Sequence, residues 1–68
     1  MRLRDLREDA DKKQSEIAKY LNVRQNTYSQ YENGQRQLPI EVLIALAIYY
    51  HTSTDYILGL TDIREPYK

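Results

Sequence analysis

The chain of 68 residues contains no cysteine. Neither disulfide bonds nor a cysteine-based metal site can therefore stabilise so small a fold, and close helix packing must do so, alone or with a partner chain. A chain without cysteine also suits a reducing compartment, so we expect a cytoplasmic protein.

Long apolar runs are also lacking. The longest, Val42 to Tyr50, is too short to cross a bilayer, and the opening Met-Arg-Leu-Arg-Asp shows no apolar core of a signal peptide. We therefore expect no membrane partner. The length predicts a single small domain, residues 1–68.

The chain has no excess of basic residues, because ten Lys and Arg balance ten Asp and Glu. A formal net charge of zero argues against a strongly basic nucleic-acid binder. The charges are nevertheless unevenly spread: eight basic and six acidic residues precede Gln37, whereas two basic and four acidic residues follow Arg36. A solvated surface explains this mild polarity equally well.

Patterns of catalytic and metal-binding residues are missing as well. The single histidine, His51, has no second histidine and no ligand spacing around it. The sequence shows no nucleophile paired with a base and no phosphate-binding loop, and it is short for an enclosed pocket. We therefore expect no enzyme activity, no metal and no cofactor.

The spacing of apolar residues predicts an all-α fold. Five short helices are expected, at about residues 2–9, 14–21, 25–33, 40–50 and 53–58. Asn22 tolerates the left-handed conformation, so the second and third helices have the spacing of a helix-turn-helix. The polar tail, residues 60–68, is expected to be loose or to pack on a partner.

The fourth predicted helix is apolar around nearly its whole circumference. Such a helix is either central to the core or partly covered by another chain, and in a chain this short we expect both. Tyr49, Tyr50 and Tyr56 are either edges of the core or a dimer patch, and we favour the patch. Ser53 is expected to cap the fifth helix.

The third predicted helix has two different faces. Tyr28 and Tyr31 lie three residues apart on one side, and we expect them in the core with their hydroxyls at its rim. The other side carries amides and a hydroxyl: Gln25, Asn26, Ser29 and Gln30. An amide presents a donor and an acceptor in one plane, which matches the edge of adenine in a major groove. On composition alone, an uncharged solvated surface is an equal alternative.

Taken together, these features resemble the Cro/C1-type helix-turn-helix family, also called the XRE family, of phage repressors and small bacterial regulators. The resemblance covers about Leu3 to Leu60, and Tyr-Glu-Asn-Gly followed by Arg36 and Pro39 is its most specific part. It is carried by Arg7, Gln14, Glu16-Ile17-Ala18, Leu21-Asn22-Val23, Thr27, Tyr31-Glu32-Asn33-Gly34, Arg36, Pro39 and Thr52 to Gly59. It implies a five-helix, lambda repressor-like DNA-binding domain whose helix-turn-helix is formed by helices 2 and 3.

The resemblance also implies roles for individual residues. Base contacts would come from Gln25, Asn26, Ser29 and Gln30. Backbone phosphates would be bound by Lys13, Gln14, Arg24, Thr27, Asn33 and Arg36. For Asn33 and Arg36 an approach to the minor groove is the alternative. Arg7 and Glu32 would form a partly buried ion pair that ties the first helix to the third.

Two residues depart from the family pattern. Lys13 and Arg24 stand where relatives usually have a Ser or Thr helix cap, so about 1 kcal/mol of cap stabilisation is expected to be lost at each. Both residues add positive charge near the expected path of the phosphates. A solvated charge and a phosphate contact are near-equal interpretations for each.

The resemblance implies sequence-specific binding of double-stranded DNA by a transcriptional regulator. We expect a repressor that binds a two-fold operator as a homodimer, with two recognition helices in successive major grooves. The alternative is an antitoxin or anti-repressor whose main role is to bind a partner protein, through the apolar fourth helix and the acidic C-terminal half.

Overall fold

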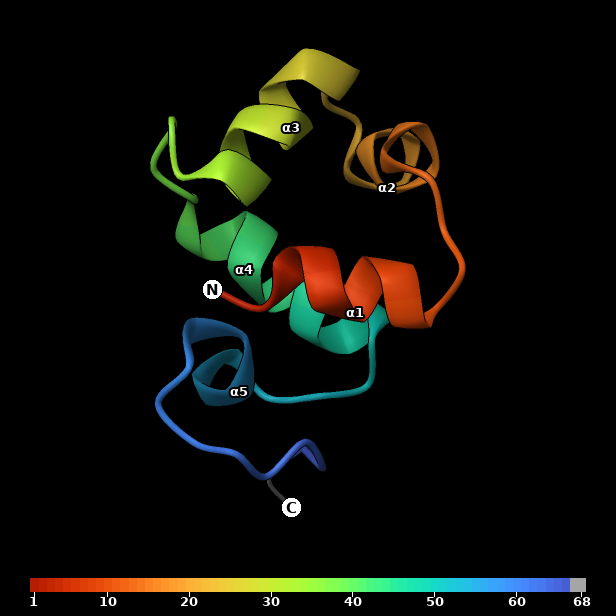
Figure 1. The fold of residues 1–68 in the computed structure, drawn as a ribbon. Helices are drawn as coiled ribbons and strands as arrows, with labels where there is room; N and C mark the ends of the chain where they lie inside the picture. Colours follow the sequence, from red (N-terminus) through yellow and green to blue (C-terminus); the bar gives the residue numbers. More distant parts are fainter. Residues whose placement is uncertain (67–68) are drawn as a thin grey trace.

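A computed structural model describes residues 1–66 of the chain and shows five helices there, without a strand. The helices are α1 (Leu3–Asp9), α2 (Gln14–Leu21), α3 (Gln25–Asn33), α4 (Ile40–Tyr49) and α5 (Thr54–Leu58) (Figure 1). This arrangement confirms the predicted all-α class, with α2 and α3 as the helix-turn-helix. The expected ranges of α1, α4 and α5 are each one residue too long, because cap positions are occupied by Arg2, Tyr50 and Ser53.

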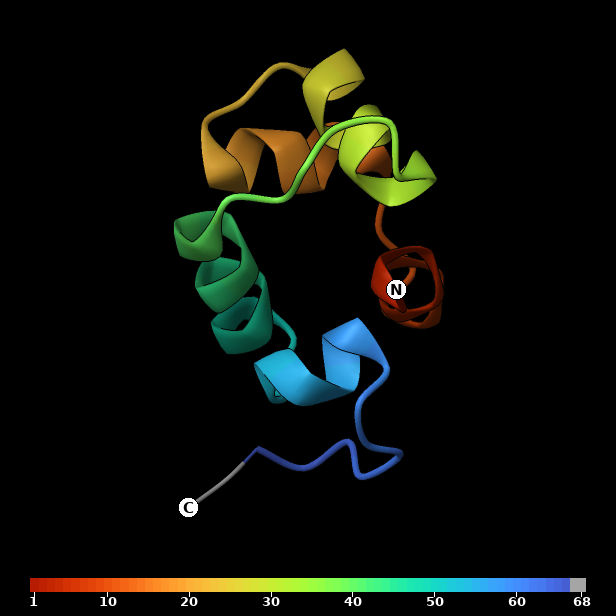
Figure 2. The ribbon, with the colours of Figure 1, turned by 90° about the vertical axis from the view of Figure 1, so that its left-hand side faces the viewer.

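The helices surround one core. Helices α2 and α3 lie at one end of the molecule, α1 and α4 flank its middle, and α5 lies at the other end (Figures 1 and 2). Every helix contributes at least one fully buried side chain: Leu3, Leu6, Ile17, Tyr28, Leu46 and Ile57. Full burial of an aliphatic or aromatic side chain contributes about 1.5–3 kcal/mol, so this core is what holds α3 in place.

Left-handed residues set the angle between α2 and α3 and the end of α3. Asn22 has φ 59° and ψ 43° at the C-cap of α2, and the following Val23 donates its N–H to the Ala18 carbonyl at 3.0 Å. Gly34 ends α3 with φ 75°. These are the conformations that the sequence predicts at both positions. His51 is also left-handed, with φ 53°, which was not predicted.

The segment after Gly59 returns to the body of the protein. The guanidinium of Arg2 donates to the Thr61 carbonyl and to Asp62 Oδ1, both at 2.6 Å, and lies 4.2 Å from the centre of the Tyr56 ring. The Thr52 hydroxyl donates to the Arg64 carbonyl. The expectation of a loose tail is therefore wrong for this stretch, whereas packing on a partner stays a prediction, and Tyr67 and Lys68 lie outside the described residues.

The tyrosines of the C-terminal half do not form one exposed patch. Tyr50 is buried in the core, and Tyr49 is half-buried with its ring centre 4.6 Å from that of Tyr20. The prediction of a dimer patch is therefore wrong for Tyr50. The exposed apolar surface of α4 lies elsewhere, since Ile40, Ile44 and Ile48 are 69%, 48% and 70% exposed.

Candidate nucleic-acid interface

The outer face of α3 borders an open groove of about 520 Å³, which we call the amide groove. Its walls are formed by Gln14, Gln25, Asn26, Ser29, Gln30 and Gln35. The structure thus brings all four expected base-contacting residues together with the first residue of α2. None of the six side chains is charged, so a ligand entering the groove meets hydrogen-bond donors and acceptors and some apolar surface.

Gln35 was not predicted as part of this site. It follows Gly34, and the left-handed turn there directs the chain back toward α3, so that the Gln35 N–H donates to the Gln30 carbonyl at 2.9 Å. The positive φ expected for a glycine after a helix was a signal for this reversal. What the sequence did not show is that the reversal places a further amide beside the face that is predicted to contact bases.

Lys13 and Arg24 occupy the N-cap positions of α2 and α3, and both are exposed. Neither side chain caps its helix, as predicted, because ammonium and guanidinium groups only donate hydrogen bonds. At α2, Glu16 Oε1 accepts the Lys13 N–H at 3.0 Å, which supplies half of a capping box. Each helix thus begins with a cation beside its uncapped first-turn N–H groups, which suits an anion.

The remaining candidates for phosphate binding differ in their exposure to solvent and in the hydrogen bonds that they already make. Thr27 is half-buried, while Asn33, the last residue of α3, and Arg36, just beyond the helix, are exposed. Asn33 Oδ1 accepts from Arg4 Nη2 at 2.9 Å, which leaves its amide N–H groups for another acceptor. Arg36 Nε donates to Gln30 Oε1 at 2.9 Å, so a phosphate candidate and a base candidate contact each other directly.

Arg7 and Glu32 form an ion pair between α1 and α3. Arg7 donates two hydrogen bonds to the Glu32 carboxylate, from Nε to Oε2 at 2.6 Å and from Nη2 to Oε1 at 3.2 Å. Its third nitrogen, Nη1, donates to the Lys12 carbonyl at 3.0 Å. The Glu32 side chain is fully buried and that of Arg7 is 14% exposed. The pair holds the end of α3 against α1 in a geometry typical of bidentate arginine–carboxylate pairs.

Gln14 joins this ion pair to the amide groove. Its Nε2 donates to Glu32 Oε1 at 3.2 Å, and the same residue lines the groove. A primary amide has two N–H donors, so one remains for a ligand while the other is held by the carboxylate. The buried charge of Glu32 therefore fixes the side chain at the start of α2.

The pKa values of the pair follow from this geometry. Burial alone would raise the pKa of Glu32, but the hydrogen bonds led by that from Arg7, together with the charge of Arg7, hold it below its usual value. The hydrogen bond to Glu32 raises the pKa of Arg7. Both groups thus remain charged, and the pair is an ionic link rather than a neutral hydrogen bond.

Two tyrosine hydroxyls lie beside the pair in the interior. Those of Tyr28 and Tyr50 are buried close to each other and to Glu32, without a partner at hydrogen-bonding geometry among residues 1–66. Burial raises the pKa of Tyr28 and raises that of Tyr50 to about 12. The expectation that the Tyr28 hydroxyl lies at the rim of the core is wrong, because the whole Tyr28 side chain, its hydroxyl oxygen included, is buried.

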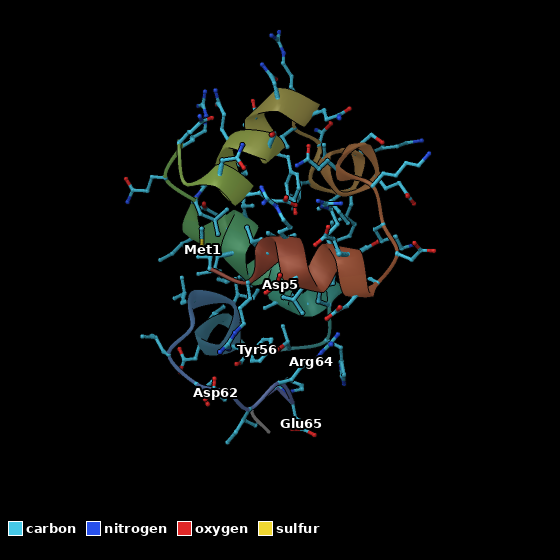
Figure 3. The ribbon with its side chains drawn as sticks, viewed as in Figure 1. Met1, Asp5, Tyr56, Asp62, Arg64 and Glu65 are labelled. Atoms are coloured by element: carbon cyan, nitrogen blue, oxygen red, sulfur yellow. The ribbon has the colours of Figure 1, made fainter. Side chains whose placement is uncertain are left out.

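The acidic C-terminal segment lies far from the amide groove. Figure 3 shows Asp62, Arg64 and Glu65 beyond α5, at the end of the molecule opposite α3. In residues 1–66 no helix has the length and apolar character needed to cross a bilayer, and no cluster of three or more metal-ligating side chains occurs there. Exposed basic residues adjoin the groove residues in the chain, and the one carboxylate shown to contact a groove residue within the described part of the chain, that of Glu32, is paired with Arg7.

The family model described as Helix-turn-helix matches residues 3–57. The chain therefore belongs to this helix-turn-helix family, as the resemblance to Cro/C1-type regulators predicts. It is 37% identical over 65 residues to the "Uncharacterized HTH-type transcriptional regulator YobD" of Bacillus subtilis (strain 168), covering 96% of this chain and 58% of that protein.

A second relative from the same organism is the "HTH-type transcriptional regulator ImmR". It is 37% identical over 64 residues, covering 94% of this chain and 50% of ImmR. The chain thus spans only 50–58% of the length of these curated relatives. No solved structure gives a significant match.

Proposed function

We propose that this chain binds double-stranded DNA through the outer face of α3 and acts as a transcriptional regulator. The observation that carries this proposal is the amide groove, where uncharged amides line one surface and exposed cations stand beside it. Amide side chains read base edges in the major groove, while cations neutralise the phosphates that border it. Family membership and the names of the relatives support the same function.

In this proposal, α3 enters the major groove and α2 lies across the DNA backbone. Bases are contacted by Gln25, Asn26, Ser29 and Gln30. Phosphates are bound by Lys13, Gln14, Arg24, Thr27, Asn33 and Arg36. The Arg7–Glu32 pair takes no part in binding itself and keeps α3 and Gln14 in position.

We further propose that the domain comprises residues 1–68, acts in the cytoplasm without catalysing a reaction, and represses transcription as a homodimer on a two-fold operator. Two recognition helices of such a dimer would lie roughly 34–36 Å apart. The row formed by Ile40, Ile44 and Ile48 is the surface that we assign to the second copy, because these residues follow one face of α4 and are exposed in the single chain.

That same row supports a second candidate function. An antitoxin or anti-repressor would use the apolar face of α4 to hold a different protein, with DNA binding in a secondary role. The two functions predict different partners for one surface, since a regulator pairs with itself and an antitoxin is purified with a stoichiometric second protein.

The function is tested by fluorescence anisotropy at about 150 mM salt, where screening limits nonspecific attraction. The probes are the DNA upstream of the protein's own gene and an unrelated fragment of equal length. We expect selective binding to the first probe. Equal, weak binding to both would contradict a specific regulator and favour the antitoxin, to be sought by co-purification from the source cell.

The role of the amide groove is tested with paired variants. Gln25→Ala and Gln30→Ala are each expected to cost about 1–3 kcal/mol of binding to the operator. The matched control is Gln37→Ala, which removes an exposed amide that does not line the groove. Unchanged operator affinity in the Gln25→Ala, Gln30→Ala double variant would refute the assignment of the base-contacting face.

The assignment of the dimer surface is tested by sedimentation of the free protein and of its complex with DNA. Ile44→Glu places a charge in the middle of the α4 row and is expected to reduce self-association. Ile63→Glu is the control, because Ile63 is also exposed but belongs to the C-terminal segment. Equal self-association of the two variants would exclude this face as the dimer surface.

A further inference from the structure

One side-chain hydrogen bond joins a residue that we assign to base recognition to a residue that we assign to phosphate binding. Arg36 Nε donates to Gln30 Oε1 at 2.9 Å, and the Arg36 N–H donates to the Gln30 carbonyl at 3.3 Å. The two residues are therefore linked through both side chain and backbone. The turn at Gly34 makes this possible, because it directs the chain back over the last turns of α3.

The chemistry of the pair fixes the orientation of the Gln30 amide. A guanidinium group has only donors, so the atom of Gln30 that faces it must be the oxygen. Rotating the amide by half a turn would set its NH₂ group against Arg36, donor against donor, and would lose the hydrogen bond. An amide without this neighbour could present its donor and acceptor to a base edge in either order.

We propose that Arg36 is a positioning residue for base recognition, which holds the Gln30 amide in the single orientation that reads an adenine. This inference rests on the proposed binding of DNA by α3. With Arg36 on one lone pair of Oε1, the second lone pair accepts from N6 of adenine while the Gln30 NH₂ group donates to N7. Arg36 thereby contributes to specificity without contacting a base.

Arg36 keeps the capacity to bind the DNA backbone at the same time. Only Nε is used by the Gln30 side chain, and the exposed guanidinium has further N–H groups on its terminal nitrogens. One side chain therefore bridges a phosphate and a base-contacting amide. Phosphate binding and base recognition are coupled at this position, whereas Arg24 at the start of α3 supplies charge alone in our assignment.

The test compares Arg36→Lys with Arg64→Lys, a matched change at an exposed residue of the C-terminal segment, far from α3 (Figure 3). Both variants keep a positive charge, but lysine lacks the planar Nε donor that holds an amide. Affinities are measured for the operator and for a panel carrying every single base-pair substitution. The base pair read by Gln30 is the one at which Gln30→Ala abolishes discrimination, and there the wild type is expected to discriminate about 5- to 150-fold.

We expect Arg36→Lys to reduce discrimination at that base pair about tenfold or to abolish it, with discrimination elsewhere and the salt dependence unchanged. Arg64→Lys is expected to leave the whole pattern intact. Full discrimination at the Gln30 base pair in Arg36→Lys would overturn this inference and leave the proposed function standing. Uniform, weak binding of the wild type across the panel would overturn both.

Discussion

Replacing one member of the Arg7–Glu32 pair is expected to destabilise the protein more than replacing both. Removing one partner leaves the other charge buried, which costs about 3–5 kcal/mol. We expect about 3 kcal/mol for Arg7→Met or Glu32→Met, at the lower end, because Arg7 is 14% exposed. A domain of this size has a stability of roughly 3–10 kcal/mol, so each single variant loses at least about a third of it.

The double variant Arg7→Met, Glu32→Met removes both charges and leaves two apolar side chains of similar length. Such a replacement is often neutral or stabilising, so we expect it to be more stable than either single variant. Arg4→Met is the control, since Arg4 Nε lies 3.6 Å from the same carboxylate but its side chain is 56% exposed. That exposed contact is expected to contribute at most about 1 kcal/mol.

Unfolding in urea, followed by far-UV circular dichroism, measures these differences. If the slope of the unfolding free energy against urea concentration is the same in all variants, a shift of the midpoint reports a change in stability. A loss of about 3 kcal/mol corresponds to a melting temperature roughly 12–24 °C lower in a domain of this size. Additive effects of the two single variants within about 0.5 kcal/mol would refute the coupling of the pair. A loss in Arg4→Met equal to that in Arg7→Met would refute the argument from burial.

The same pair predicts how stability depends on pH. Because folding lowers the pKa of Glu32, its contribution is fully present above the unfolded-state value of about 4.3 and is lost as the pH falls through the lower folded-state value. Glu32→Met should lack this component of acid destabilisation. An identical decline in wild type and Glu32→Met below about pH 4.3 would contradict the lowered pKa.

Three further predictions concern helix ends. Asn22→Ala is expected to lose about 1–2 kcal/mol because Asn22 is left-handed, while Asn22→Gly should be tolerated; equal losses in urea unfolding would contradict this. Ser53→Ala should lose about 1 kcal/mol, since Ser53 Oγ accepts the Tyr56 N–H at 3.0 Å, and an unchanged urea midpoint would show that this cap is dispensable. Arg24→Ser should gain about 1 kcal/mol of stability while lowering the slope of DNA affinity against salt by about 1, and an unchanged slope would remove Arg24 from the phosphate contacts.

The sequence predicted the local features of the fold well. The ends of α2 and α3 follow from Asn22 and Gly34, whose residue types favour the left-handed conformation. The apolar spacing placed Tyr28 and Tyr31 in the core, where both are buried. These signals lie within a few residues of the feature that they predict, so a single sequence contains them.

Features that depend on distant contacts were not predictable in the same way. Arg2 holds the segment at Thr61 and Asp62, some sixty positions along the chain, and no periodicity records such a contact. The burial of Tyr50 likewise depends on how α4 packs. For the site, the residue types of the amide groove were apparent, but the bond between Gln30 and Arg36 requires the three-dimensional path of the turn after α3.

The neutral net charge is compatible with DNA binding once the charges are placed in space. The molecule is up to 31 Å long, and Asp62 and Glu65 lie at the end opposite α3 (Figure 3). At physiological salt, interactions between exposed charges are screened beyond about 8 Å, so these carboxylates do little to the potential at the amide groove. Glu32, the carboxylate beneath the groove, is already neutralised by Arg7. In the proposed complex the flanking cations would therefore act locally. Because long-range attraction would be weak, base contacts would supply a larger share of the binding free energy.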